Sequence, residues 1–216
     1  MSKKILCVVD IQPEYHEFCK CILNAFVDTI PNAVKTHDMT IFFFNGGCTS
    51  NDTETTVKEW LLGLGVDECT LCDITFIQKE YGFLRDVMNS NDDDDVLTLP
   101  DTEIITVLQE LDCRGLISSN ELETTEFLDI KNVSHEDWIL AHEFNLGVEF
   151  PDFHFSELPT KLADANISLW GGGKTECLRE IDLYLTAIGA TTETIDDLVY
   201  GSDDMDIQKM QPIQVA

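Results

Sequence analysis

Basic residues are scarce in this sequence, which has 13 lysines and arginines against 41 aspartates and glutamates and a formal net charge of −28. A chain with this charge repels DNA, RNA and anionic membrane surfaces, because all of these are negatively charged too. Long hydrophobic runs are also missing, and no stretch approaches the roughly 20 apolar residues that span a bilayer. We therefore expect neither nucleic acid nor a membrane as a partner.

The N-terminal residues are not expected to form a secretory signal. The first apolar run is only about five residues long and ends at Asp10, which predicts a buried strand and not a signal peptide. Eight cysteines in a chain of this length, without such a signal, favour buried reduced thiols over a disulfide framework. The close pairs Cys19/Cys21 and Cys69/Cys72 are weak evidence for a four-ligand zinc site. We expect a cytoplasmic protein that has no metal and no cofactor.

The sequence does contain apolar runs that alternate with helical patterns. The runs are short and nearly continuous, as expected for strands that are buried on both faces. Helical patterns follow Pro13, a capping residue at Asp52 or Thr53, and a glycine turn. This alternation predicts a three-layer α/β fold with a mostly parallel sheet. The expected strands span residues 4–10, 39–44, 73–79, 167–170 and 193–200, and the helix after the glycine turn spans 176–188.

An acidic segment interrupts the alternation. Residues 86–155 contain 18 acidic and 2 basic residues, and helical patterns occur in "TEIITVLQELD" and around "HEDWILAHEF". We interpret the segment as an insertion between two parts of one domain, 1–85 and 156–202, with a loosely held tail at 203–216. A segment this acidic must be docked, solvated or paired. It could therefore form a lid or structural unit, an oligomer contact, or a surface for a basic protein partner.

Three reactive side chains are expected at one edge of the sheet. Asp10 closes the first strand, Lys79 closes the third, and Cys177 lies in the first helical turn after the fourth. In an open parallel sheet, functional groups gather at the carboxyl ends of the strands. A helix N-terminus and a lysine both stabilise a thiolate, which predicts a lowered pKa for Cys177, and an aspartate can accept the thiol proton. Together they form a coherent set for nucleophilic catalysis.

The motifs around these residues, "CVVDIQ", "FIQKEYGF" and "GGGKTEC", resemble those of the isochorismatase-like cysteine hydrolases, over about residues 4–83 and 156–200. The resemblance implies a triad in which Asp10 is the base, Lys79 activates or orients, and Cys177 attacks a carbonyl carbon. It also implies a cis peptide in the glycine turn, which an ungapped match places between Gly172 and Gly173. Nicotinamidases of this family bind metal through a D-x-H pair after the second strand, where this sequence has no histidine.

The glycine turn has a second interpretation as an anion site. "GGGKT" matches only the end of a nucleotide-binding loop, because Ser168 stands where that loop needs its first glycine. The turn is too short to wrap a nucleotide phosphate. Backbone N–H groups of Gly172 and Gly173, with Lys174, could still bind an oxyanion or another small anion. This role is compatible with hydrolase chemistry.

The combined expectation is a cysteine-dependent hydrolase that cleaves a C–N bond of a small amide-type substrate. The alternative is a catalytically silent isochorismatase-like protein whose acidic insertion binds a basic protein. The two differ in whether Asp10, Lys79 and Cys177 form a working site.

Overall fold

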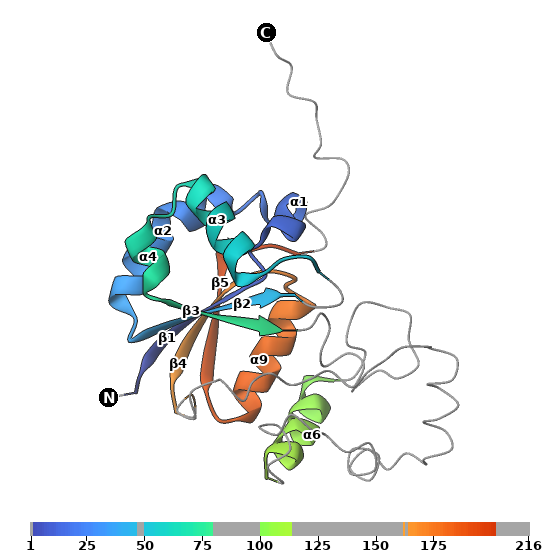
Figure 1. The fold of residues 1–216 in the computed structure, drawn as a ribbon. Helices are drawn as coiled ribbons and strands as arrows, with labels where there is room; N and C mark the ends of the chain where they lie inside the picture. Colours follow the sequence, from blue (N-terminus) through green and yellow to red (C-terminus); the bar gives the residue numbers. More distant parts are fainter. Residues whose placement is uncertain (1, 47–49, 80–99, 114–161, 163, 202–216) are drawn as a thin grey trace, which may run out of the picture.

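Five parallel strands form one sheet in the order β3-β2-β1-β4-β5, in the computed structural model, which describes residues 2–46, 50–79, 100–113, 162 and 164–201 (Figure 1). Every observed strand overlaps an expected one. The one clear shift is in β5, which begins two residues earlier than the sequence pattern suggests. The strands are β1 (Lys4–Val9), β2 (Met39–Asn45), β3 (Ile74–Lys79), β4 (Asn166–Gly171) and β5 (Thr191–Val199).

The helices connect the strands much as the sequence pattern predicts. The pattern after Pro13 is broken, because the chain turns at residues 20–22, where the Ile22 amide donates to the Cys19 carbonyl. Thr53 caps α3 through a reciprocal pair of hydrogen bonds with Thr56. The helical elements are η1 (Pro13–Tyr15), α1 (His16–Cys19), α2 (Leu23–Thr36), α3 (Glu54–Leu64), α4 (Glu68–Cys72), α6 (Asp101–Cys113) and α9 (Cys177–Ala187).

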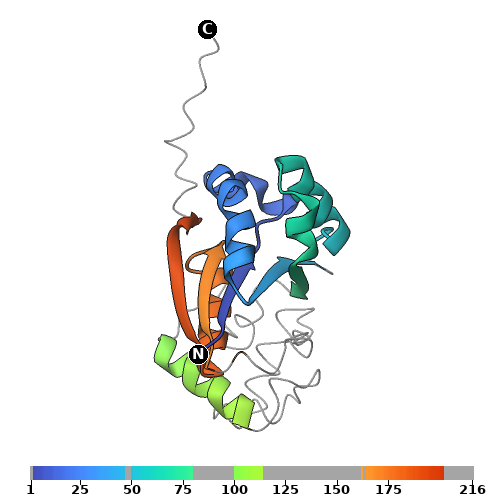
Figure 2. The same ribbon diagram turned by 90° about the vertical axis from the view of Figure 1, so that its left-hand side faces the viewer.

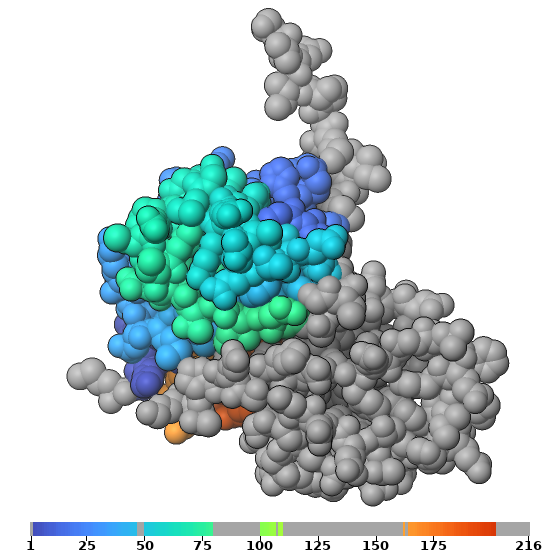
Figure 3. Space-filling model, viewed as in Figure 1, coloured from blue at the N-terminus to red at the C-terminus, as the bar shows by residue number. Residues whose placement is uncertain are grey.

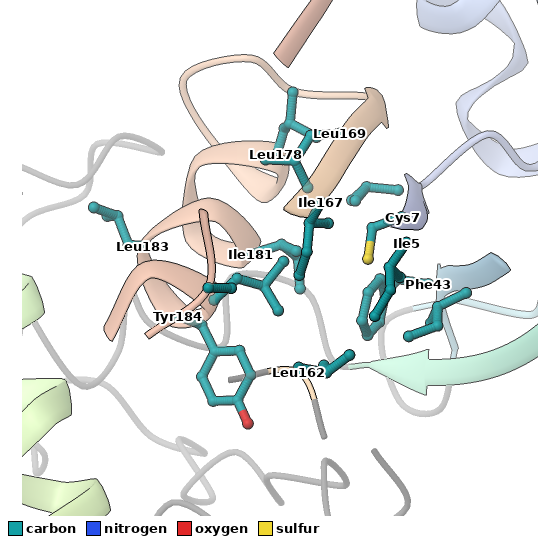
Figure 4. Packing of buried hydrophobic residues seen from close by; sticks show 14 of the residues in the cluster. Ile5, Cys7, Phe43, Leu162, Ile167, Leu169, Leu178, Ile181, Leu183 and Tyr184 are labelled. Atoms are coloured by element: carbon teal, nitrogen blue, oxygen red, sulfur yellow. The ribbon is translucent and has the colours of Figure 1, made fainter. Parts of the chain in front are cut away.

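Two apolar clusters cover the two faces of the sheet. Alternate residues of β1 point in opposite directions, so that Cys7 packs with residues of α9 and Leu6 packs with residues of α2. Figure 4 shows the first cluster, in which Ile181 of α9 lies close to the sheet. On the other face, α3 and α4 form a continuous surface in the space-filling view (Figure 3). Burial on both faces explains why the strands are almost wholly apolar.

These features show an α/β fold with an all-parallel sheet, and they are compatible with the three expected layers. β1 is central, and the chain leaves it first toward β2 and later returns on its other side as β4. The strands that follow β1 therefore lie on one side of it up to β3 and on its other side from β4, so the strand order reverses between β1 and β4. In open α/β sheets, ligands bind outside the carboxyl ends of the strands at such a point.

The described start of the acidic segment is docked on the α/β body. Helix α6 confirms the first helical pattern of the segment and packs against α9 (Figure 1); in Figure 2 it lies across the lower end of the sheet. Ile104 and Leu108 are fully buried in the cluster that also contains α9 residues. At the surface, the Arg179 guanidinium donates from Nε and Nη2 to Asp101 Oδ1, at 2.9 and 2.6 Å. The second helical pattern, the expected boundaries at 85/86 and 155/156, and the tail lie outside the described residues.

Within the described part of the chain, no helix has both the length and the apolar character that crossing a membrane requires.

Candidate active site

Asp10 follows β1 with its backbone in the left-handed region, at φ 52°. This conformation is uncommon for a residue other than glycine and persists only when its surroundings hold it. Two hydrogen bonds do so here: the Asp10 amide donates to the Phe43 carbonyl at 2.9 Å, and the Tyr200 hydroxyl donates to the Asp10 carbonyl at 2.8 Å. The carboxyl side chain is fully buried.

Lys79 reaches this carboxylate from the end of β3, although β2 lies between β1 and β3. Its Nζ atom lies 2.8 Å from Asp10 Oδ2, and both side chains are at most 2% exposed. The contact is an ion pair whose alignment falls outside hydrogen-bond geometry. Lys79 Nζ and the two Asp10 carboxylate oxygens are buried and have no hydrogen-bond partner among the described residues. The pair therefore retains hydrogen-bonding capacity that a substrate or water can use.

Cys177 joins the pair from the start of α9. Its side chain is 6% exposed, and its thiol lies close enough to Asp10, Lys79 and Glu180 for their charges to act on it. The structure thus brings Asp10 and Lys79 into direct contact and places Cys177 near both. Their catalytic roles stay a prediction.

The expected lowering of the Cys177 pKa is wrong for this arrangement. Burial raises the pKa of the thiol well above its usual range, the nearby ammonium of Lys79 opposes this, and the carboxylates of Asp10 and Glu180 raise it further. For Lys79, burial disfavours the charged form, but the negative charges around it, that of Asp10 first, outweigh burial and raise its pKa. The resting site therefore contains a thiol beside a carboxylate and an ammonium.

The glycine turn depends on close approaches that exclude side chains. A Cβ on Gly171, whose φ is 103°, would lie 2.0 Å from the Val9 carbonyl oxygen, and one on Gly172 would lie 1.5 Å from Tyr200 Cζ. The cis peptide expected between Gly172 and Gly173 is absent, since all peptide bonds of the described residues are trans. Left-handed conformations at Gly171 and Gly173 turn the chain instead.

The amides of the turn are partly in use. The Gly172 amide donates to the Val9 carbonyl at 2.8 Å, and the Lys174 amide donates to the Tyr200 carbonyl at 3.0 Å. The Lys174 side chain is exposed and pairs with Asp196 at 2.6 Å. By contrast, the Cys177 amide has no acceptor among the described residues, and it lies at a helix N-terminus. It can therefore donate to an oxyanion that forms at the thiol, as can the Gly173 amide, which also donates to no other described residue.

A small pocket of about 80 Å³ is lined in part by Cys177. Its lining combines aromatic side chains with residues of the glycine turn and of the start of α9. The lining residues are Tyr15, Phe18, Gly173, Glu176, Cys177 and Tyr200.

Several residues of the site were missed by the sequence reasoning. Glu180 is 2% exposed and lies three residues after Cys177 in α9, a spacing that places both on one helix face and could have revealed it. Gln12, within the "DIQ" motif, bonds Asn45 in both directions and donates to Asp52 at 2.8 Å. Tyr200 had no local signal, because its partners are distant in the sequence.

No cluster of three metal-ligating side chains occurs in the ranges that the structure describes. The histidines of the acidic segment, including the D-x-H pair Asp152 and His154, lie outside those ranges.

Comparisons with protein-family models and with curated proteins gave no match to this chain. The resemblance to isochorismatase-like hydrolases therefore rests on three short sequence motifs. Function has to be argued from the residues themselves.

Proposed function

We propose that the protein is an isochorismatase-like cysteine hydrolase that cleaves a C–N bond of a small amide-type substrate. The observation that carries the proposal is a buried Asp10–Lys79 ion pair next to the Cys177 thiol at a pocket. Burying two charges is costly, and retaining them beside a nucleophile is typical of catalytic sites. The left-handed backbone of Asp10 adds strain at the same point, which is also common at functional sites.

In the first step, the Cys177 sulfur attacks the substrate carbonyl carbon while Asp10 accepts the thiol proton. A raised thiol pKa is compatible with this route, since the proton leaves as the S–C bond forms and no free thiolate is needed beforehand. The Cys177 amide donates to the oxyanion that develops, and the charge of Lys79 stabilises the total negative charge of the site. The protonated Asp10 then gives its proton to the leaving nitrogen as the C–N bond breaks.

In the second step, Asp10 accepts a proton from water, and the resulting hydroxide attacks the thioester carbonyl. The C–S bond breaks, the proton returns to the Cys177 sulfur, and a carboxylic acid is released. Lys79 keeps its proton throughout, because the surrounding negative charges raise its pKa. Its role is to hold the Asp10 carboxylate in place and to balance the negative charge of the site in both steps.

One observation favours a second candidate, the catalytically silent protein. The Cys177 thiol is 6% exposed and its pKa is raised, as for a structural cysteine. The basic-partner version of this candidate needs an outward-facing acidic surface; helix α6 buries Ile104 and Leu108 against the body and leaves Asp101 and Glu103 exposed.

A panel of small primary amides and N-carbamoyl amines separates the two candidates through ammonia release. Cys177→Ala should lower the rate by at least about a thousandfold, and Asp10→Asn should lower it severely. Cys69→Ala removes an exposed thiol and serves as the matched control. Hydrolysis that survives in Cys177→Ala would refute the proposed mechanism. Complete inactivity of the native protein on the panel would support the silent candidate.

A further inference from the structure

Tyr200 connects the ends of three strands beside the thiol. Its hydroxyl donates to the Asp10 carbonyl at 2.8 Å, its amide donates to the Gly171 carbonyl at 3.1 Å, and its carbonyl accepts from the Lys174 amide at 3.0 Å. The side chain comes directly after β5, is 5% exposed, and lines the pocket together with Cys177. It therefore contacts the residue after β1, the end of β4 and the glycine turn at once.

The hydroxyl acts where the backbone is strained. Asp10 has φ 52°, and the orientation of its carboxylate follows from this backbone conformation. The bond from its amide to Phe43 restrains one side of the residue, and the bond from Tyr200 restrains its carbonyl on the other side. Without the hydroxyl, the carbonyl loses its donor and the residue is free to relax toward a more favourable conformation.

We propose that Tyr200 is a positioning residue for Asp10: its hydroxyl holds the Asp10 backbone so that the carboxylate meets both Lys79 and Cys177. The proposal rests on the proposed function, for which Asp10 is the base. Burial, followed by the negative charge of Asp10, raises the pKa of Tyr200, so the hydroxyl keeps its proton and remains a donor.

A purely structural role would come from the ring alone. The ring packs in the second apolar cluster and occupies the space beside Gly172. Tyr200→Phe keeps these contacts and removes only the hydroxyl, so it separates positioning from packing. Tyr184→Phe is the matched control, because Tyr184 is 4% exposed and lies in the cluster on the other face.

The experiment measures alkylation of Cys177 by iodoacetamide between pH 7 and 10, followed by peptide mapping. The charged side chains that face the thiol are Asp10, Lys79 and Glu180. Because the Asp10 carboxylate raises the thiol pKa, Asp10→Asn should shift the alkylation profile to lower pH. Tyr200→Phe should shift it in the same direction, with alkylation at pH 8 about threefold faster or more. Greater exposure of the thiol would also speed alkylation, but it would not lower kcat, so the turnover measured below separates the two causes.

A second readout is turnover of any amide that the native protein hydrolyses. Tyr200→Phe should lower kcat about tenfold, as expected for losing one aligned hydrogen bond, with KM changed less than about twofold. Circular dichroism checks that each variant is folded.

The outcomes distinguish the two proposals. A shift in Asp10→Asn with a wild-type profile in Tyr200→Phe would overturn the positioning role and leave the proposed function standing. An equal shift in Tyr184→Phe would also overturn it, because any buried hydroxyl would then matter. Profiles that do not move in any variant would show that Asp10 and the thiol are not coupled, which contradicts the proposed function itself.

Discussion

Replacing Lys79 by methionine should destabilise the protein strongly, because it leaves the Asp10 carboxylate buried without a partner. The two charged atoms are 2.8 Å apart, a separation that corresponds to about 6 kcal/mol of attraction at an effective dielectric constant of about 20. Desolvation offsets part of this attraction in the native protein. Removing one member of a buried pair typically costs about 3–5 kcal/mol, and we expect Lys79→Met to fall in that range.

The double variant tests the origin of the loss. Asparagine tolerates a left-handed backbone, so Asp10→Asn should not add backbone strain. Asp10→Asn combined with Lys79→Met removes both charges and should be more stable than Lys79→Met alone by about 1–3 kcal/mol. Lys20→Met serves as the control, because it removes an exposed pair with Glu17 and should cost less than about 0.5 kcal/mol.

Urea unfolding at pH 7, followed by tryptophan fluorescence, measures these free energies of unfolding. A loss below about 1 kcal/mol in Lys79→Met, with no coupling to Asp10→Asn, would refute the buried ion pair.

Alkaline pH should destabilise the native protein from about pH 9 upward. Burial raises the pKa values of three thiols in the folded chain, so they keep their protons at alkaline pH. In the unfolded chain the same thiols lose their protons above their ordinary pKa of 9.0. The free energy of unfolding therefore falls by up to about 1.4 kcal/mol per pH unit for each thiol. The thiols concerned are those of Cys7, Cys19 and Cys177. Urea titrations at pH 8 and 10 check this prediction, and equal stability at both would contradict it. Gly172→Ala should cost more than about 3 kcal/mol, because its Cβ would overlap the Tyr200 ring, and a thermal shift of only a degree or two would count against the turn geometry. Glu180→Gln should lower the Cys177 thiol pKa, since that carboxylate raises it; an unchanged alkylation profile would place Glu180 outside the site.

Much of the fold could be predicted because the signals are local. A strand buried on both faces is an almost unbroken apolar run, as in β1, and Thr53 marks the start of α3 with its own side chain. Once the strands are taken as parallel, their carboxyl ends share an edge, which explains why Asp10 and Lys79 could be paired before the strand order was known.

The remaining features depend on contacts between distant segments. The Tyr200 hydroxyl bonds to Asp10, which lies 190 positions earlier in the sequence, and no local sequence pattern predicts that bond. The pKa of Cys177 depends mainly on how deeply the thiol is buried. The sequence shows the helix N-terminus and the lysine, which lower this pKa, but not the burial that raises it, so the predicted direction was wrong. The turn at Gly172 adopts trans peptides because left-handed neighbours and the Tyr200 ring shape it, which motif matching does not reveal.

Acyl transfer to Cys177 tests the central claim most directly, and it needs no knowledge of the natural substrate. The protein is incubated briefly with p-nitrophenyl acetate, quenched in acid, and examined by intact-protein mass spectrometry and peptide mapping. The account predicts one acetyl group on Cys177, removable by hydroxylamine as expected of a thioester, and absent from Cys177→Ala. Acetylation confined to lysines or to exposed cysteines such as Cys69, with Cys177 unmodified, would contradict the assignment of Cys177 as the nucleophile.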